Sequence, residues 1–187
     1  MSLTLLYHGT DIDSAKEICD AQLADVSRGS KKVDFGPGFY MTDDLARAKT
    51  WAYRKARVRK KRAALVSAYV DLDSARPIIT RFEEDVRWAR FVINNRNGMS
   101  YINSVMFKEN NLDARYHITY GKIADYEVRN IADKLKEQSR MIVSPDYICN
   151  DDYAMQYAFH TKLAISYIKK YCYSIIWGKV LWLYQVK

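Results

Sequence analysis

The chain has 187 residues, of which 49% are apolar and 28% are charged, a balance typical of one soluble domain with its own hydrophobic core. Three widely separated cysteines show neither metal-ligand nor redox-motif spacing, which indicates a reducing, cytoplasmic setting and no metal site. No basic segment followed by a long apolar run opens the chain, so we expect no signal peptide, no membrane span and a mature protein that begins near Met1.

The net charge of +8 is concentrated in one segment. Nine basic residues and no acidic ones lie between Arg47 and Arg62, so the remainder of the chain is close to neutral. Such a run usually forms the solvated face of a helix. It would also suit an anionic partner, such as a nucleotide, a nucleic acid or an acidic protein surface, with an affinity that falls as the salt concentration rises.

Residues 3–7 form an apolar run that predicts an inner strand, with His8-Gly9-Thr10 at its end. A helix is expected next, and either Asp13 or Ser14 can cap its free N–H groups. Its packing side is expected to consist of Ala15, Ile18 and Leu23. A polar loop at residues 28–32 then leads into a segment rich in glycine and aromatic residues.

Residues 34–42 contain two glycines, one proline and two aromatic residues. Gly36 and Gly38 permit backbone angles that side chains forbid and allow a ligand to approach closely, while Pro37 fixes one dihedral angle. We expect a stiff, open turn followed by an extended segment in which Phe39 and Tyr40 point to opposite faces. A tight turn followed by a core aromatic residue is the alternative interpretation.

The remaining segments show helical and strand patterns in turn. Asp43-Asp44 can begin a basic helix whose apolar positions recur at three- and four-residue spacing, namely Leu45, Ala48, Trp51, Ala52 and Ala56. Strands are expected at residues 66–72, 116–120 and 155–160, helices at 83–95, 127–138 and 162–171, and a closing hairpin or strand at 174–186. This order predicts an α+β domain rather than regular βαβ winding.

Three of these elements, in this order, carry a family resemblance: His8-Gly9-Thr10, the turn from Gly36 to Tyr40, and Gln156 on a late strand. Together they resemble the ADP-ribosyltransferase superfamily, in its branch of diphtheria toxin and poly(ADP-ribose) polymerases. More narrowly, the chain is similar to an uncharacterised bacterial domain family assigned to that superfamily. The motifs span roughly residues 4 to 170 and are Tyr7 to Thr10, Asp34 to Thr42, Trp51-Ala52, Phe91-Val92 with Asn95-Arg96, and Gln156 to Thr161.

The resemblance implies an ADP-ribosyltransferase fold, with a split antiparallel or mixed β-sheet and flanking helices, that binds NAD as a co-substrate. Gly9 would hold the nicotinamide carboxamide through its backbone, His8 would hydrogen-bond the nicotinamide ribose, and Tyr40 would stack on the pyridinium ring. The NAD-binding residues are then expected to be His8, Gly9, Thr10, Gly38, Phe39, Tyr40 and Tyr53. The catalytic residues are expected to be His8, Tyr40 and Gln156.

Gln156 stands where members of the superfamily commonly have a glutamate, whose charge stabilises the oxocarbenium-like ribose. A glutamine can still hydrogen-bond the ribose hydroxyl but cannot act as a general base. Polymer synthesis is therefore not expected. Mono-ADP-ribosylation remains open if the acceptor is already nucleophilic or if another carboxylate assists, with Asp151, Asp152 and Glu127 as candidates. Taken alone, Gln156 would be an ordinary solvent-facing strand residue.

We expect residues 1–172 to form the ADP-ribosyltransferase-like domain and the apolar tail of residues 173–187 to pack on it. The resemblance implies a mono-ADP-ribosyltransferase acting on a protein or nucleic-acid acceptor. It also implies a toxin or effector, cytoplasmic or delivered into a target cell, with an antitoxin or immunity partner. Two alternatives stay open: a catalytically weak NAD-binding pseudo-enzyme, and a nucleic-acid- or protein-binding module that acts through the basic helix at 47–62. Arg96 would pair with an acid or reach a phosphate, and His117 and His160 would be structural.

Overall fold

The computed structural model describes residues 3–30, 32–97, 110–124, 128, 144–148, 154–177 and 180–184. Helices and two separate β-sheets confirm the predicted α+β class with a split sheet. The chain divides into two compact units. Unit 1 comprises Met1–Asp25, Tyr40–Ile78 and Lys162–Lys187, and unit 2 comprises Val26–Phe39 and Ile79–Thr161. Within the described residues, no helix has the length and apolar character needed to cross a membrane.

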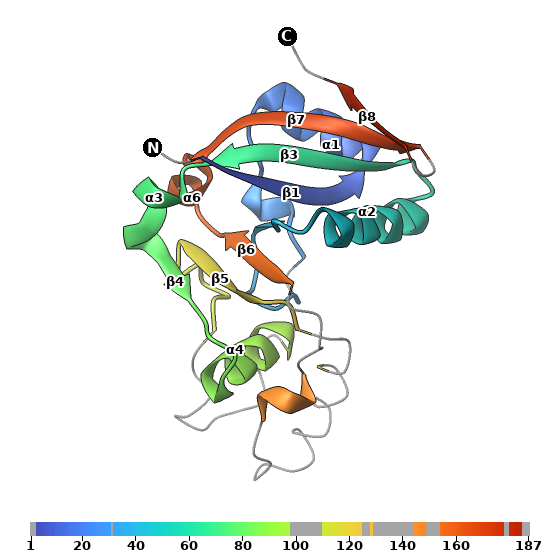
Figure 1. Cartoon of the computed structure of the whole chain (residues 1–187). Helices are drawn as coiled ribbons and strands as arrows, with labels where there is room; N and C mark the ends of the chain where they lie inside the picture. Colours follow the sequence, from blue (N-terminus) through green and yellow to red (C-terminus); the bar gives the residue numbers. More distant parts are fainter. Residues whose placement is uncertain are drawn as a thin grey trace. The chain divides into compact units, whose positions relative to one another are not determined.

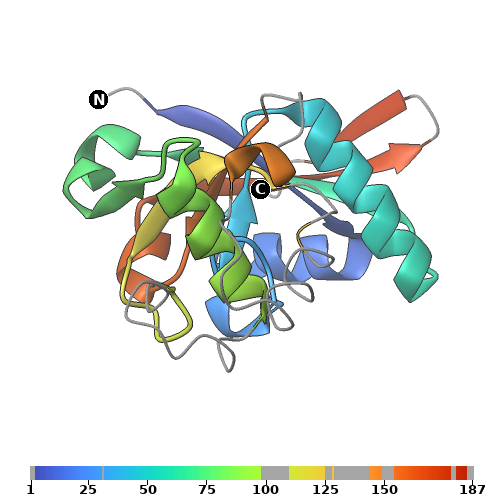
Figure 2. The ribbon, with the colours of Figure 1, turned by 90° about the horizontal axis from the view of Figure 1, so that it is seen from below.

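Unit 1 is built on a four-stranded sheet in the order β1-β3-β7-β8, in which each neighbouring pair is antiparallel. Its strands are β1 (Thr4–Asp11), β3 (Ala63–Val70), β7 (Ile168–Trp177) and β8 (Val180–Tyr184). α1 (Ile12–Ala21) and the longer α2 (Leu45–Arg59) pack against this sheet (Figure 1). α2 is also seen beside these strands from below (Figure 2). The short helices of unit 1 are α3 (Leu72–Ala75), η2 (Arg76–Ile78) and α6 (Lys162–Ile165).

Unit 2 contains β4 (Ile79–Arg81), β5 (Ile118–Lys122) and β6 (Met155–Phe159), and its helices include α4 (Val86–Asn97), η1 (Val26–Arg28) and η4 (Pro145–Tyr147). The second sheet has the order β2-β6-β5-β4, and β2 (Phe39–Met41) is where the chain passes from unit 2 into unit 1. Phe35, Phe82 and Phe91 pack as a buried aromatic cluster in which the closest ring centroids are 4.2 Å apart. This cluster is part of the apolar core of unit 2.

The start of α1 differs from the prediction. The N-cap is Asp11, whose carboxylate accepts hydrogen bonds from the backbone N–H groups of Asp13 at 3.2 Å and Ser14 at 3.1 Å. The prediction of Asp13 or Ser14 as the cap was therefore wrong, because the strand ends in a residue that can cap the next helix directly. Leu23 lies beyond the helix and is 58% exposed, so it does not belong to the packing side.

The helix predicted over residues 162–171 was also wrong beyond its first turn. α6 ends at Ile165, and β7 begins at Ile168 because β-branched and aromatic residues pair there with β3. β7 continues through residues 172 and 173 and pairs with β8, which confirms the predicted closing hairpin. Apart from Val128, the helix predicted at 127–138 lies outside the described residues. Glu127, Asp151 and Asp152 lie outside them as well.

Candidate functional site

The later half of β1 places His8 against the segment that carries Tyr40. Backbone hydrogen bonds join Tyr7 and Thr42 in both directions, at 2.8 and 2.9 Å, and hold this segment along β1. The His8 Nδ1 atom lies 2.6 Å from the carbonyl oxygen of Tyr40. Because a carbonyl oxygen can only accept a hydrogen bond, Nδ1 carries the imidazole proton. Two residues that are 32 positions apart in the sequence are thus in direct contact.

The other imidazole nitrogen of His8 faces a lysine. Nε2 lies 3.3 Å from Nζ of Lys55 on α2, so the neutral ring accepts a hydrogen bond there from the ammonium group. Burial and then the charge of Lys55 lower the pKa of His8 well below its usual value, while the Tyr40 carbonyl acts in the opposite direction. His8 is therefore a neutral imidazole with a defined tautomer and an acceptor at Nε2.

Gly9 is required by helix packing. A Cβ atom at this position would lie 2.0 Å from the carbonyl oxygen of Ala48 and 2.6 Å from the backbone nitrogen of Ala52, both on α2. The helix backbone therefore lies directly against the strand, and no larger residue fits between them. This close approach holds α2 next to His8. It also means that the space beside the Gly9 α-carbon is occupied by α2.

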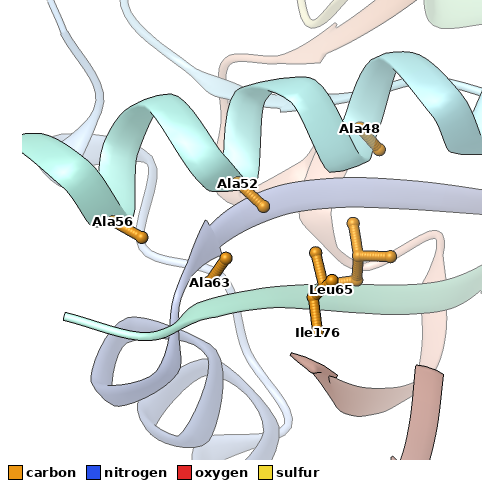
Figure 3. Packing of buried hydrophobic residues seen from close by; sticks show 6 residues of the cluster. All are labelled: Ala48, Ala52, Ala56, Ala63, Leu65 and Ile176. Carbon is orange, nitrogen blue, oxygen red and sulfur yellow. The ribbon is translucent and has the colours of Figure 1, made fainter. Parts of the chain in front are cut away.

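The side of α2 that faces the sheet is lined with alanines. The buried cluster consists of Ala48, Ala52, Ala56, Ala63, Leu65 and Ile176, and the three helix alanines point toward the strands (Figure 3). Asp44 caps the helix by accepting a hydrogen bond from the backbone N–H of Arg47 at 3.0 Å, as Asp43-Asp44 predicted. Because the alanines turn inward, the long basic side chains project from the remaining faces of the helix.

Asp11 links the N-terminus of α1 to the C-terminal part of α2. Its Oδ2 atom lies 2.6 Å from Nη1 of Arg59, which also donates to Ser14 Oγ at 2.8 Å. Burial by itself would raise the pKa of Asp11, but the hydrogen bonds from Ser14 and Arg59 lower it to about 2. Asp11 is thus ionised at neutral pH and already paired. Further along the basic run, Lys61 pairs with Asp13 at 2.6 Å.

The remaining predicted NAD-binding residues of unit 1 differ in accessibility. Tyr40 is half-buried between the buried residues Phe39 and Met41, as the expected alternation requires. Tyr53 on α2 is 46% exposed, whereas Thr10 on β1 is 2% exposed. Of the three aromatic residues in the predicted NAD-binding set, Phe39 is buried, so Tyr40 and Tyr53 are the more accessible ones.

Gln156 lies on β6 in unit 2, within a buried network centred on Asp34. Its Nε2 atom donates to Oδ2 of Asp34 at 2.7 Å, and the residue is 2% exposed. The backbone N–H of Ala124 donates to the same oxygen at 3.0 Å, and Arg96 forms an ion pair with Oδ1. The ion pair expected for Arg96 is confirmed. Gln156 is not the solvent-facing residue that its position alone suggested, because the buried carboxylate needs donors from several directions.

Gly38 and His160 form a second close contact of unit 2. A Cβ atom at Gly38 would lie 2.8 Å from Nδ1 of His160, and that nitrogen lies 2.6 Å from the carbonyl oxygen of Pro37. The opposite nitrogen contacts Thr119 Oγ1 at 2.9 Å, and burial lowers the pKa of His160 to about 4. Gly36 has a φ angle of 85°, which favours glycine. These contacts, and that of His117 Nδ1 with Thr161 Oγ1 at 2.9 Å, support structural roles for both histidines.

Unit 1 therefore contains His8, Gly9, Thr10, Tyr40 and Tyr53, and it brings His8 and Tyr40 into contact. Gly38, Phe39 and Gln156 belong to unit 2. The expected roles of all eight residues toward NAD stay predictions.

Sequence reasoning did not single out Lys55 or Asp34. The four-residue spacing of Lys55 and Arg59 within the basic run could have placed both on one helix face. For Asp34 no signal was available, because its partner Gln156 is 122 positions away.

A search of the curated proteins found no match to this chain. One sequence family matches residues 4–170, which is most of the 187 residues and the same span over which the motifs were found. Its description assigns no activity, so it names neither a substrate nor a site. The chain belongs to the family described as "Protein of unknown function (DUF3990)".

Proposed function

We propose that this protein is an NAD-dependent mono-ADP-ribosyltransferase that transfers ADP-ribose to a protein or nucleic-acid acceptor. The observation that carries the proposal is the contact between His8 Nδ1 and the Tyr40 carbonyl oxygen at 2.6 Å. Two residues of the resemblance, one from its first motif and one from its second, are therefore in contact within unit 1 although a helix and a long turn separate them in the sequence. This contact supports the proposal that both residues belong to one site.

The chemistry of His8 suits a sugar ligand. A neutral imidazole with its proton on Nδ1 can accept a hydrogen bond from a ribose hydroxyl at Nε2 once the Lys55 ammonium group turns away from that nitrogen. The ring of Tyr40 would stack on the cationic pyridinium, an interaction worth about 1 kcal/mol or more when water is excluded. In the reaction, the ribose C1′–N bond to nicotinamide breaks and nicotinamide leaves with the electron pair. A bond forms between C1′ and the acceptor nucleophile, whose proton passes to solvent or to a base.

A second candidate is an NAD-binding protein with little or no turnover. The bond from Gln156 Nε2 to Asp34 Oδ2 at 2.7 Å favours this candidate, because the same amide group would have to leave its buried partner to contact a ribose. Gln156 also carries no charge that would stabilise an oxocarbenium ion. Polymer synthesis remains excluded from the proposal for this reason.

A third candidate is a binding module that acts through α2. Its exposed basic side chains include Arg54 and Arg57, and the exposed Lys60 follows at its C-cap. These side chains would suit a nucleic acid or an acidic protein surface. Under the enzymatic proposal the same surface would instead attract the acceptor. The proposal extends to a toxin or effector role in the cytoplasm, opposed by an antitoxin or immunity protein.

The decisive experiment measures nicotinamide release from NAD and transfer of labelled ADP-ribose to a cell lysate. His8→Ala and Tyr40→Ala should abolish both signals. Tyr69→Ala and His117→Ala are matched controls that should retain them, because Tyr69 is an exposed tyrosine on β3 and the His117 ring contacts Thr161, which is not a predicted site residue. Equal activity of the His8 and Tyr40 variants and the wild type would refute the proposed site.

The same preparation separates the alternatives. NAD binding by the wild type without nicotinamide release would identify the protein as a pseudo-enzyme. A combined charge reversal at Arg54, Arg57 and Lys60 spares the ion pairs of Arg59 and Lys61 with Asp11 and Asp13. If this variant alone lost partner binding while the His8 variant kept it, the binding-module interpretation would replace the enzymatic one.

A further inference from the structure

We infer that Lys55 and Arg59 on α2 form a phosphate-binding subsite beside His8, suited to the diphosphate of a dinucleotide. The inference rests on the proposed function, because it assigns a part of NAD to residues that the family resemblance does not include. It starts from the side chains that surround His8 in unit 1 and from the charges that they leave uncompensated.

Lys55 is held at the site by its contact with His8. Its Nζ atom lies 3.3 Å from His8 Nε2, and this neutral nitrogen accepts a hydrogen bond but supplies no negative charge. Among the residues that the structure describes, no carboxylate forms an ion pair with Lys55. The ammonium group therefore has two further N–H donors and a full charge to offer to a ligand.

Arg59 follows Lys55 by one turn of α2, so both side chains lie on the same helix face. Its contacts with Asp11 and Ser14 both use Nη1, and the side chain is 53% exposed. Neither contact uses Nε or Nη2. The guanidinium group is thus fixed in place by a buried carboxylate while part of its donor set remains accessible.

The charges around this pair are unbalanced. Asp11 is the carboxylate that Arg59 contacts, and it also accepts hydrogen bonds from Asp13 and Ser14 at the start of α1. Loss of hydration and then the neighbouring charge of Arg59 lower the pKa of Lys55 to about 8, with Asp11 acting in the opposite direction. Two cations facing one carboxylate leave a net positive charge, which a bound phosphate would neutralise.

The position of this charge next to His8 favours a sugar phosphate over an isolated anion. The Nε2 atom of His8 has one lone pair, which accepts from Lys55 in this structure. When the ammonium group turns to a phosphate oxygen, this lone pair becomes available to a ribose hydroxyl, a donor that a fully ionised phosphate lacks. Lys55 and Arg59 donate only, and so they suit phosphate oxygens. An acceptor in contact with one cationic donor, with a second cation one helical turn further along α2, matches the order of groups in a ribose that carries a phosphate.

The test measures the binding of three probes by calorimetry: ADP-ribose, inorganic pyrophosphate and nicotinamide. Lys55→Met should weaken ADP-ribose and pyrophosphate by about tenfold, the usual effect of losing one charged hydrogen bond, and should leave nicotinamide unchanged. Lys55→Arg should retain most of the affinity. Arg57→Met is the matched control: it removes one exposed charge two positions along α2, on another face of the helix, and should change the affinities by less than about twofold.

Three results would overturn the inference. These are wild-type protein that binds neither ADP-ribose nor pyrophosphate, a Lys55→Met variant that binds ADP-ribose as tightly as the wild type, and equal losses from Lys55→Met and Arg57→Met. The second of these results overturns the inference even if the affinity for pyrophosphate falls, because the subsite would then serve the free anion. If binding of ADP-ribose depends on Lys55 but NAD releases no nicotinamide, the subsite stands and the transferase proposal fails.

Discussion

Replacing Gln156 with glutamate should destabilise the protein, and the loss should depend on pH. In the wild type, Nε2 of Gln156 donates to Oδ2 of Asp34 at 2.7 Å, and both residues are buried. The substitution would place a second carboxylate oxygen where a donor now lies. Arg96 contributes a positive charge to this cluster, but it pairs with the other oxygen of Asp34. The two carboxylates would therefore repel each other at short range.

The size of the effect follows from the distance. Two unit charges about 4 Å apart, at an effective dielectric constant of about 20, repel by about 4 kcal/mol. This corresponds to a rise of about 3 units in the pKa of the introduced glutamate, from about 4.3 to about 7. Between these values the folded variant keeps a proton that the unfolded chain has released, so stability is lost as the pH rises. We expect a deficit of about 1 kcal/mol at pH 5 and about 4 kcal/mol at pH 8.

The assay is chemical denaturation of the wild type, Gln156→Glu and Gln156→Met at both pH values. Methionine has a similar length but removes the donor without adding a charge. This substitution should therefore lower the free energy of unfolding by about 1–3 kcal/mol, independently of pH. The difference between the two variants isolates the repulsion. A glutamate variant that is as stable as the methionine variant at pH 8, or one whose deficit is the same at both pH values, would refute the buried contact with Asp34.

Three further outcomes are expected from measurements of unfolding free energy. Gly9→Ala should lower the free energy of unfolding by about 3 kcal/mol or more, because the added Cβ atom would lie only 2.0 Å from the Ala48 carbonyl oxygen. A variant of unchanged stability would contradict the close helix packing. The pKa of His160 is lowered to about 4, so the folded state binds fewer protons than the unfolded state below pH 6.5. The free energy of unfolding should therefore fall by up to about 3 kcal/mol as the pH falls toward 4. His160→Gln should show a smaller loss over this pH range, and an unchanged loss would assign it to other groups. Gln22→Ala should lower the free energy of unfolding by about 1–3 kcal/mol. The side-chain amide of Gln22 donates to the Tyr171 carbonyl oxygen at 3.0 Å and accepts from the Tyr171 backbone N–H at 3.1 Å. Gln22→Glu should recover only the second of these bonds.

Local patterns were sufficient for much of the fold. The capping carboxylate at Asp44 and the spacing of Ala48, Ala52 and Ala56 predicted α2, and the alternation of apolar and polar residues predicted β3. Each of these signals arises from neighbouring residues, so a sequence window contains it completely. The helix predicted over 162–171 failed at β7 for the opposite reason. The preference of that segment is decided by pairing with β3, which lies about a hundred residues earlier.

The candidate site shows the same division. The resemblance selected His8 and Tyr40, and the order of motifs was available from the sequence. The sequence did not reveal the tautomer of His8. It depends on the Tyr40 carbonyl group and on Lys55, which contact the ring only when β1, β2 and α2 come together.

By itself, the sequence determined the α+β class, the basic character of α2 and the motifs that carry the family resemblance, since all three depend on residue type and local spacing. Tertiary structure alone decided that Gly9 packs against a helix, that Lys55 borders His8 and that Gln156 serves a buried carboxylate. These contacts join residues between 39 and 122 positions apart, and their energies come from burial and charge pairing that no single segment contains.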